Sequence, residues 1–261
     1  ISSKLELSIK YLEMAKARLD ELVVRRGLAT SRNEAKALIM SGKVREGVHR
    51  LEKPGLKVYD DIELIEEPGK RFVSRGGEKL EGYVEAFDLS FEGLDVLDVG
   101  ASTGGFTDCA LKHGARSMTC LDVGKGQLHG SLRSDPRIHN IEKINARYLE
   151  AEDLPLPSYQ RVVMDLSFIS LKTVFPAVWP FLASEGILVA LVKPQFEVGK
   201  VIADKFRGVI KDDRERTRAL NRVREFALSE LEGASLQGCI ESPIKGSDGN
   251  IEYLLGLSKL K

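Results

Sequence analysis

Four charged residues stand where a fold can bring their side chains together. Lys193 ends the apolar run of GILVALVKPQFE, and Asp165 ends that of RVVMDLSFISL. Lys79 lies in RGGEKLEG, and Glu252 lies in NIEYLLGL. A lysine is seldom placed at the end of a buried strand without a partner, because burying its charge is costly. Together the four residues predict a charge network suited to transferring an activated methyl group to a hydroxyl, which needs an aligned acceptor and a proton-accepting side chain.

A glycine-rich loop follows the first apolar run, in DVLDVGASTGGFTD. Gly100, Gly104 and Gly105 favour the close approach of a backbone to a nucleotide-like ligand at the carboxyl end of a sheet. A dinucleotide fingerprint would read G-x-G-x-x-G, but Ser102 occupies the position of its middle glycine. The loop therefore weakens the case for a dinucleotide and favours S-adenosylmethionine, which carries no phosphate.

Two aspartates complete this candidate cofactor site. Asp122 ends the next apolar run, about 20 residues further on, where its carboxylate can accept hydrogen bonds from ribose hydroxyls. Asp98 ends the first run and is well placed to orient the ammonium group of S-adenosylmethionine. The ribose contact alone would serve NAD equally well, so an NAD-dependent oxidoreductase is an alternative.

The elements that must position these residues begin at about Leu94. Apolar strand-like runs alternate there with helix-length segments, which indicates an α/β fold with a parallel sheet covered on both faces. The candidate strands are DVLDVG, SMTCLDVG, RIHNIEKIN, RVVMDLS, GILVALVKP, SLQGCIESP and EYLLGLSKL, and the candidate helices cover 104–113, 125–134, 170–184 and 212–232. Only a loop separates the last two strands, so they are expected to form an antiparallel hairpin.

The first 50 residues are basic although the whole chain is neutral. They carry eleven Lys and Arg against six acidic residues, a net charge of +5. RLDELVVRRGLA predicts a short helix that ends at Gly27, and SRNEAKALIMSG predicts a second helix that opens with the capping box Ser31–Glu34 and stops near Gly42. Short strands are expected in KVREGVHRLEKPGLKV and DDIELIEE. The basic helix faces of this small module are either a solvated surface or a nucleic-acid site.

The glycine-rich and charged segment PGKRFVSRGGEKLEG predicts a connector between the two regions. We expect an N-terminal extension over 1–14 and the basic α+β module over 15–67. A linker with the start of the catalytic region should cover 68–86, and the catalytic domain should cover 87–261.

Length and composition are those of an ordinary globular protein. The 261 residues suffice for one large α/β domain and a small second domain, and the balance of 39 basic against 39 acidic residues gives no overall preference for a polyanion. No segment reaches the roughly 20 apolar residues that span a bilayer, and the start lacks a signal-peptide pattern, so no stable membrane association is expected. Cys109, Cys120 and Cys239 have no metal-like spacing and are expected to be packing thiols in a reducing cytosol, with no metal site.

The motifs VSRGGEKLE, GASTGGFTD, MDLSFISL, LVKPQFE and GNIEYL resemble those of the TlyA family, and RLDELVVRRGLATSRNEAKALIMSGKV resembles its S4 motif. The resemblance covers nearly the whole chain from about residue 15. It implies an S4-type RNA-binding domain before an FtsJ-like methyltransferase domain with a Rossmann-like fold. It also implies a cytoplasmic enzyme that methylates ribose 2′-hydroxyls of ribosomal RNA with S-adenosyl-L-methionine, acting on ribosomal RNA or ribosomal subunits.

The resemblance assigns residues to three sites. The family's Lys-Asp-Lys-Glu tetrad falls on Lys79, Asp165, Lys193 and Glu252; Lys193 would accept the proton, the two acids would orient it, and Lys79 would be an electrostatic partner. The expected cofactor-binding residues are Asp98, Gly100, Ser102, Gly104, Gly105, Phe106, Asp122, Val123, Asn145 and Asp165. The expected RNA-binding residues are Arg18, Arg25, Arg26, Arg32, Lys36, Lys43 and Arg75.

Three positions depart from the family pattern. Lys125 stands where an aromatic residue is expected, and no Trp is found near Gly130. Asn145 stands where many methyltransferases have an acid facing the adenine amino group, although its side-chain carbonyl can accept the same hydrogen bond. These changes concern the cover over the cofactor's adenosine and leave the tetrad intact.

Two further alternatives are a non-catalytic RNA-binding assembly protein and a membrane-active hemolysin, a label that members of the family often carry. The complete tetrad argues against the first. The second would need spanning helices, amphipathic barrel strands or a long amphipathic helix, none of which the sequence indicates. The motifs specify neither the methylated nucleotide nor the oligomeric state.

Overall fold

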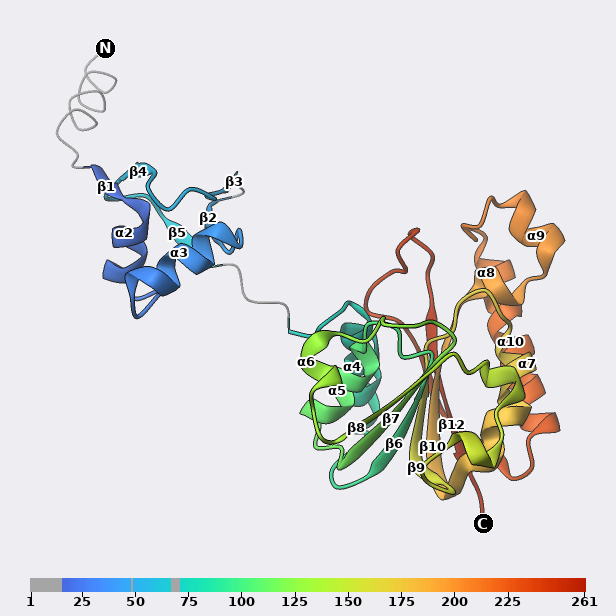
Figure 1. Ribbon diagram of the computed structural model, residues 1–261. Helices are drawn as coiled ribbons and strands as arrows, with labels where there is room; N and C mark the ends of the chain where they lie inside the picture. The colour runs from blue at the N-terminus through green and yellow to red at the C-terminus, as the bar shows by residue number, and fades with distance from the viewer. Residues whose placement is uncertain (1–15, 48, 67–70) are drawn as a thin grey trace. The chain divides into compact units, whose positions relative to one another are not determined.

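The computed structural model describes residues 16–47, 49–66 and 71–261 (Figure 1). The chain divides into two compact units, residues 1–70 and residues 71–261. The predicted N-terminal extension over 1–14 lies outside the described residues.

The N-terminal unit is a small α+β structure. Its elements are β1 (Lys16–Arg18), α2 (Leu19–Arg25), α3 (Arg32–Met40), β2 (Val44–Glu46), β3 (His49–Arg50), β4 (Lys57–Tyr59) and β5 (Leu64–Glu66). The two helices start and stop as the sequence predicts. The Ser31 hydroxyl accepts the Glu34 amide at 3.2 Å, and Gly27 and Gly42 adopt positive φ angles just beyond the helix ends. Leu19, Leu22, Val23, Ala35 and Ile39 form the core between the helices.

The second unit is built on a seven-stranded sheet with the order β11-β12-β10-β9-β6-β7-β8. The strands are β6 (Asp95–Val99), β7 (Ser117–Asp122), β8 (Ile138–Glu142), β9 (Tyr159–Met164), β10 (Leu182–Val192), β11 (Ala234–Glu241) and β12 (Tyr253–Lys259). The five strands from β6 to β10 are parallel to one another, whereas β12 is antiparallel to both β10 and β11. The predicted parallel sheet and final antiparallel hairpin are both confirmed.

Helices cover both faces of this sheet (Figure 1). They are α4 (Gly76–Phe87), α5 (Gly105–Lys112), α6 (Gly130–Arg133), α7 (Leu171–Val178), α8 (Pro194–Glu197), α9 (Lys200–Lys205) and α10 (Asp213–Glu230), with short 3₁₀ turns at Ala146–Tyr148, Ala151–Asp153 and Trp179–Phe181. One buried cluster joins α4, α5 and α6 to the sheet, and the other joins α7 and α10 to its opposite face. Of the predicted helices, 125–134 shortens to the four residues of α6.

Residues 68–82, which were expected to form the connector, include the start of helix α4 at Gly76. Leu80, Tyr83 and Val84 recur at helical spacing and are buried against the sheet, so packing outweighs the low helix propensity of the two glycines that open the helix. Gly77 is also required by the packing, because a Cβ there would lie 2.3 Å from the Phe72 ring. The tetrad residue Lys79 therefore projects from a regular helix.

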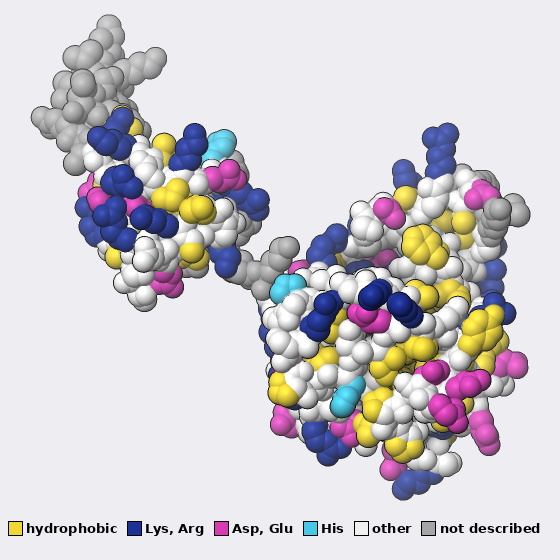
Figure 2. Space-filling model, in the orientation of Figure 1, with side chains coloured by type: hydrophobic (Ala, Val, Ile, Leu, Met, Phe, Trp, Pro, Cys, Tyr) yellow, Lys and Arg dark blue, Asp and Glu magenta, His cyan; other side chains and the backbone are white. Residues whose placement is uncertain are grey.

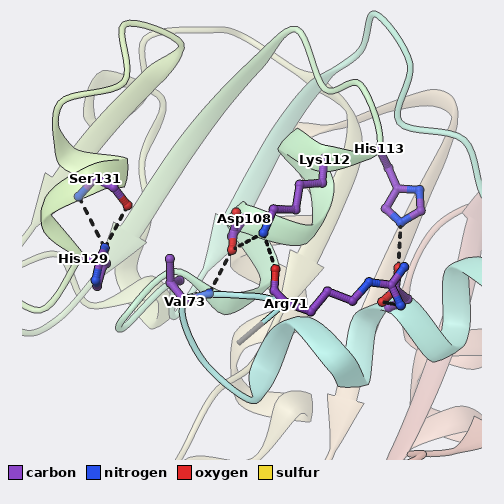
Figure 3. A network of polar contacts seen from close by, with 8 residues as sticks. Arg71, Val73, Asp108, Lys112, His113, His129 and Ser131 are labelled. Atoms are coloured by element: carbon purple, nitrogen blue, oxygen red, sulfur yellow. Dashed lines mark hydrogen bonds and ion pairs between the residues drawn. The ribbon is translucent and has the colours of Figure 1, made fainter. Parts of the chain in front are cut away.

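Polar contacts hold the segment just before α4 against α5 (Figure 3). The Asp108 carboxylate accepts the Val73 amide at 2.8 Å and the Lys112 ammonium at 3.0 Å, and Lys112 also donates to the Arg71 carbonyl. The Arg71 guanidinium pairs with buried Glu81 of α4 at 2.5 Å. Residues 71–73 are thus fixed to the first two helices of the second unit.

Candidate active site

A pocket of about 440 Å³ opens at the carboxyl ends of the parallel strands. This volume is in the range typical of small-molecule sites. Six of the residues expected to bind the cofactor line it: Gly100, Ser102, Asp122, Val123, Asn145 and Asp165. They lie at or just beyond the carboxyl ends of β6, β7, β8 and β9, so the pocket lies where an open α/β sheet ordinarily binds its ligand.

Asp122 is held firmly in the wall of this pocket. One carboxylate oxygen accepts the Ser102 amide at 2.8 Å, and the other accepts the Gly124 amide at 2.7 Å. Gln127, which was not among the expected site residues, lines the pocket beside Asp122 and bridges Ser102 and Asp122 through its side-chain amide. Asn145 also lines the pocket, and its side chain accepts the Arg147 amide at 3.1 Å.

The structure divides the glycine-rich loop into two parts. Gly100 lines the pocket, where a Cβ would lie 2.9 Å from the Asp165 carbonyl, and its φ of 86° suits glycine alone. Gly104 and Gly105 make room for other parts of the protein, because a Cβ on them would lie 2.3 Å from Leu132 and from the Ser74 hydroxyl respectively. Gly104, Gly105 and Phe106 do not line the pocket and instead pack α5 against α6 and α4.

Asp98 is fully buried and does not line the pocket either. Burial raises its pKa to about 7, opposed by the hydrogen bond from the Thr107 hydroxyl at 2.6 Å and reinforced by the charges of Asp165 and Asp122. Its second oxygen has no hydrogen-bond partner among the described residues. The sequence places Asp98 at the end of the correct strand, but the carboxylate lies behind the surface that a ligand would touch.

The tetrad residues form two ion pairs. Lys79 Nζ lies 2.6 Å from a Glu252 carboxylate oxygen, and both side chains are buried. Lys193 Nζ lies 2.7 Å from an Asp165 carboxylate oxygen and donates to the Ser167 hydroxyl at 2.9 Å. Both acids were expected to orient Lys193, but in the structure Asp165 contacts Lys193 and Glu252 contacts Lys79.

Strand register brings three of these residues to one edge of the sheet. Val192 of β10 pairs with Tyr253 of β12, so Lys193 and Glu252 leave neighbouring strands at the same level. On the other side of β10, Ala190 pairs with Met164, the last residue of β9 before Asp165. Lys79 reaches Glu252 from α4. Because Asp165 also lines the pocket, the four charged residues lie next to the pocket.

The loop after Asp165 carries an exposed aromatic ring that was not among the expected site residues. Phe168 is 90% exposed, has a positive φ of 66° and lines the pocket. Its ring lies 5.2 Å, between centroids, from that of Phe196 in the helix that follows Lys193. A bulky residue with a positive φ angle is uncommon. The position of Phe168 inside the MDLSFISL motif is the one feature of the sequence that could have indicated a functional role.

The basic residues expected to bind RNA have different surroundings. Buried Asp20 accepts hydrogen bonds from the exposed Arg18 and Arg32 guanidinium groups, which hold the pKa of its carboxyl well below the usual range. Arg25 and Arg26 both contact Asp60.

Lys36 is exposed on α3, and Lys43 is partly exposed. Lys and Arg side chains gather on the visible face of the N-terminal unit (Figure 2). Arg75, in the second unit, donates to the Lys245 carbonyl at 2.6 Å.

Neither a metal cluster nor a membrane-spanning helix is found in the part of the chain that the structure describes. No group of three or more His, Cys, Asp or Glu side chains there is arranged to hold a metal ion. None of the helices in those residues is both long and apolar enough to cross a bilayer.

The sequence of the chain is similar to those of known protein families. The S4 domain model matches residues 17–58, and the FtsJ-like methyltransferase model matches residues 72–259. The 16S/23S rRNA (cytidine-2′-O)-methyltransferase TlyA of Mycobacterium tuberculosis is 45% identical over 244 residues, which cover 93% of this chain and 90% of the relative.

Proteins named hemolysins are similar to the chain over a comparable length. Hemolysin A of Brachyspira hyodysenteriae is 40% identical over 248 residues, which cover 91% of this chain and 98% of the relative. A solved structure described as a hemolysin from Streptococcus thermophilus is 40% identical, with a TM-score of 0.70, and covers 95% of this chain and 90% of that one. The chain, which joins an S4 domain to an FtsJ-like methyltransferase domain, therefore belongs to the TlyA family, and its relatives are variously named methyltransferases and hemolysins.

Proposed function

We propose that the chain transfers a methyl group from S-adenosylmethionine to a ribose 2′-hydroxyl of ribosomal RNA. The observation that carries the proposal is the pair of ion pairs, Lys79–Glu252 and Lys193–Asp165, at the edge of the sheet where the pocket opens. The M. tuberculosis relative, similar over nearly its whole length, is named for this reaction on cytidines of 16S and 23S rRNA.

The residues of the pocket fit S-adenosylmethionine. The Asp122 carboxylate at the end of β7 suits ribose hydroxyls, and Leu121, Ile144 and Ala146 give an apolar wall for an adenine ring. Asp122 and Asp165 in the lining favour a cationic ligand. When bound, S-adenosylmethionine would supply an already activated sulfonium methyl group.

The chain itself must orient the acceptor and manage its proton. Lys193, in its neutral form, would take the proton of the 2′-hydroxyl at Nζ, with Asp165 and Ser167 fixing the position of that nitrogen. Lys79, held by Glu252, would stabilise negative charge developing on the 2′-oxygen. The exposed Phe168 ring at the pocket offers a face on which a nucleobase can stack.

The S4 domain would hold the RNA through its phosphates. Lys36, Lys43 and the arginines around Asp20 and Asp60 supply the cations, so binding should weaken as salt is raised. We further propose that Arg75 belongs to the RNA surface, at the start of α4 close to Lys79 in the sequence.

The test measures transfer of tritium from S-adenosylmethionine to ribosomal subunits that lack the modification, with the intact chain and with Lys193→Ala. The intact chain should label RNA in an alkali-resistant form, and the variant should show no transfer while binding the cofactor almost normally. Full transfer by Lys193→Ala would exclude the proposed role of that lysine. No transfer by the intact chain to either subunit or to free ribosomal RNA, with cofactor bound, would exclude the proposed acceptor.

A further inference from the structure

Glu197, at the end of α8, joins the two loops that carry Asp165 and Lys193. Its side chain is buried, with 6% exposed. One carboxylate oxygen accepts the Ser170 hydroxyl at 2.6 Å, and the other accepts the Leu171 amide at 2.7 Å. Leu171 is the first residue of α7, and the amides of the first turn have no carbonyl acceptor within the helix. The Glu197 carboxylate supplies that acceptor for Leu171.

The two loops are consequently fixed at both of their ends. At one end, β9 and β10 are paired up to Met164 and Ala190. At the other end, Glu197 binds Ser170 and Leu171. The Lys193–Asp165 pair and the hydrogen bond from Lys193 to Ser167 lie between these two attachments. A closed frame of this kind limits how far Lys193 Nζ and the Asp165 carboxylate can separate.

The same contact positions the aromatic pair. Phe196 immediately precedes Glu197, and Phe168 lies two residues before Ser170. Their rings contact each other across the gap between the loops, 5.2 Å apart between centroids. Phe168 is almost fully exposed and therefore has little packing of its own to hold it.

A carboxylate in this place is costly to stability. Burial raises the pKa of Glu197, although the hydrogen bonds from Ser170 and Leu171 and the charges of Lys172 and Arg222 oppose the rise. A side chain that penalises folding in this way is explained more readily by the geometry that it imposes on its neighbours.

We propose that Glu197 is a positioning residue for methyl transfer, which holds the Asp165 loop against the Lys193 turn so that the pair keeps its reactive geometry. The inference rests on the proposed function for its effect on rate. The contact itself can be tested without any catalysis.

The test compares Glu197→Ala, Glu197→Gln and the control Tyr159→Phe in the full chain. Tyr159→Phe removes a buried hydrogen bond to Thr119, 3.0 Å long, at the opposite end of β9, and so perturbs the same strand far from the loops. The measurements are kcat with ribosomal subunits, the Kd for S-adenosylhomocysteine and hydrogen exchange of the amides of 165–172.

Glu197→Ala should lower kcat at least about tenfold, with a smaller change in Kd, and should speed exchange over 165–172. Glu197→Gln keeps an acceptor for the Leu171 amide and should restore most of the activity. Tyr159→Phe should leave both kcat and the exchange of 165–172 close to those of the intact chain.

Two results would overturn the inference. One is a Glu197→Ala variant whose kcat falls no more than that of Tyr159→Phe while the intact chain is active. The other is unchanged exchange over 165–172, which decides against the contact even if the intact chain transfers no methyl group. An inactive intact chain with faster exchange in Glu197→Ala would contradict the proposed function and support the contact.

Discussion

Gly246 lies directly against the carboxylate of Glu252. A Cβ built on Gly246 would stand 2.5 Å from Glu252 Oε1 and 3.1 Å from Cδ. Glu252 has only 2% of its surface exposed and is paired with Lys79, so it cannot move aside without breaking that pair. The turn between β11 and β12 thus leaves no space for a side chain at Gly246 beside the Glu252 carboxylate.

Gly246→Ala should therefore reduce methyl transfer while the fold persists. We expect kcat to fall by about tenfold or more, because the displaced carboxylate would no longer hold Lys79. Gly130→Ala is the matched control, since a Cβ on Gly130 meets no atom within 4 Å. Both variants would be assayed for transfer and for melting temperature. Equal activity of the two would show that the position of Glu252 is unimportant.

Replacing Asp98 by Asn should flatten the dependence of stability on pH. The folded pKa of Asp98, about 7, lies above the ordinary value of 3.8, so its ionisation opposes folding. The contribution of protonated Asp98 to the free energy of unfolding is fully present below pH 3.8. It is lost as the pH rises through 7, and the loss amounts to up to roughly 4 kcal/mol. Asp98→Asn keeps the acceptor for Thr107 and should be more stable than the intact chain at pH 8 and similar at pH 4.

Urea unfolding of the two proteins between pH 4 and pH 8.5 measures this difference. Parallel curves would mean that Asp98 does not titrate in this range. If the carboxylate also acts on the cofactor from behind the pocket, Asp98→Asn would bind S-adenosylmethionine more weakly despite its higher stability.

Acid should loosen the N-terminal unit through Asp20. Hydrogen bonds from Arg18 and Arg32 hold the pKa of this buried carboxyl below its ordinary value of 3.8. The stability that it contributes is present above pH 3.8 and is lost as the pH falls toward the folded pKa. Amide resonances of α2, followed in the full chain from pH 6 to pH 2.5, should report this loss. Asp20→Asn should already be destabilised at pH 6, and a variant as stable as the intact chain would contradict the role of this carboxylate.

Lys36→Ala and Arg32→Ala should separate RNA binding from stability. Lys36 is exposed on α3, so its removal should weaken RNA binding and lower the salt slope by about one, without a change in melting temperature. Arg32 also supports Asp20, so Arg32→Ala should weaken binding and lower the stability of the N-terminal unit as well. Fluorescence anisotropy with ribosomal RNA at several salt concentrations checks both. Salt slopes equal to that of the intact chain would place the RNA elsewhere.

Strand ends were the most predictable part of the site. Parallel strands of an α/β sheet deliver their following residues to one edge, so Asp122, Asp165 and Lys193 could be placed from their apolar runs alone. Helices α2 and α3 were predictable because capping and positive-φ glycines are local signals.

Other features depended on contacts between distant segments. Helix α4 was hidden by its glycines, and what makes them tolerable is packing against Phe72 and α5. Gly104 and Gly105 look the same in sequence as Gly100, but their neighbours in space are Leu132 and Ser74. The partner of Glu252 could not be read from the sequence either, since spacing does not reveal which lysine lies nearer.

The Lys79–Glu252 pair joins residues that are 173 positions apart along the chain. Glu252 reaches Lys79 only after β12 has inserted between β10 and β11 in the correct register. A shift of one residue in that strand would turn its inward side chains to the other face. Contacts of such long range close late during folding. Recovery of activity after refolding should therefore lag behind recovery of secondary structure. A chain in which β12 pairs in the wrong register would be folded but inactive.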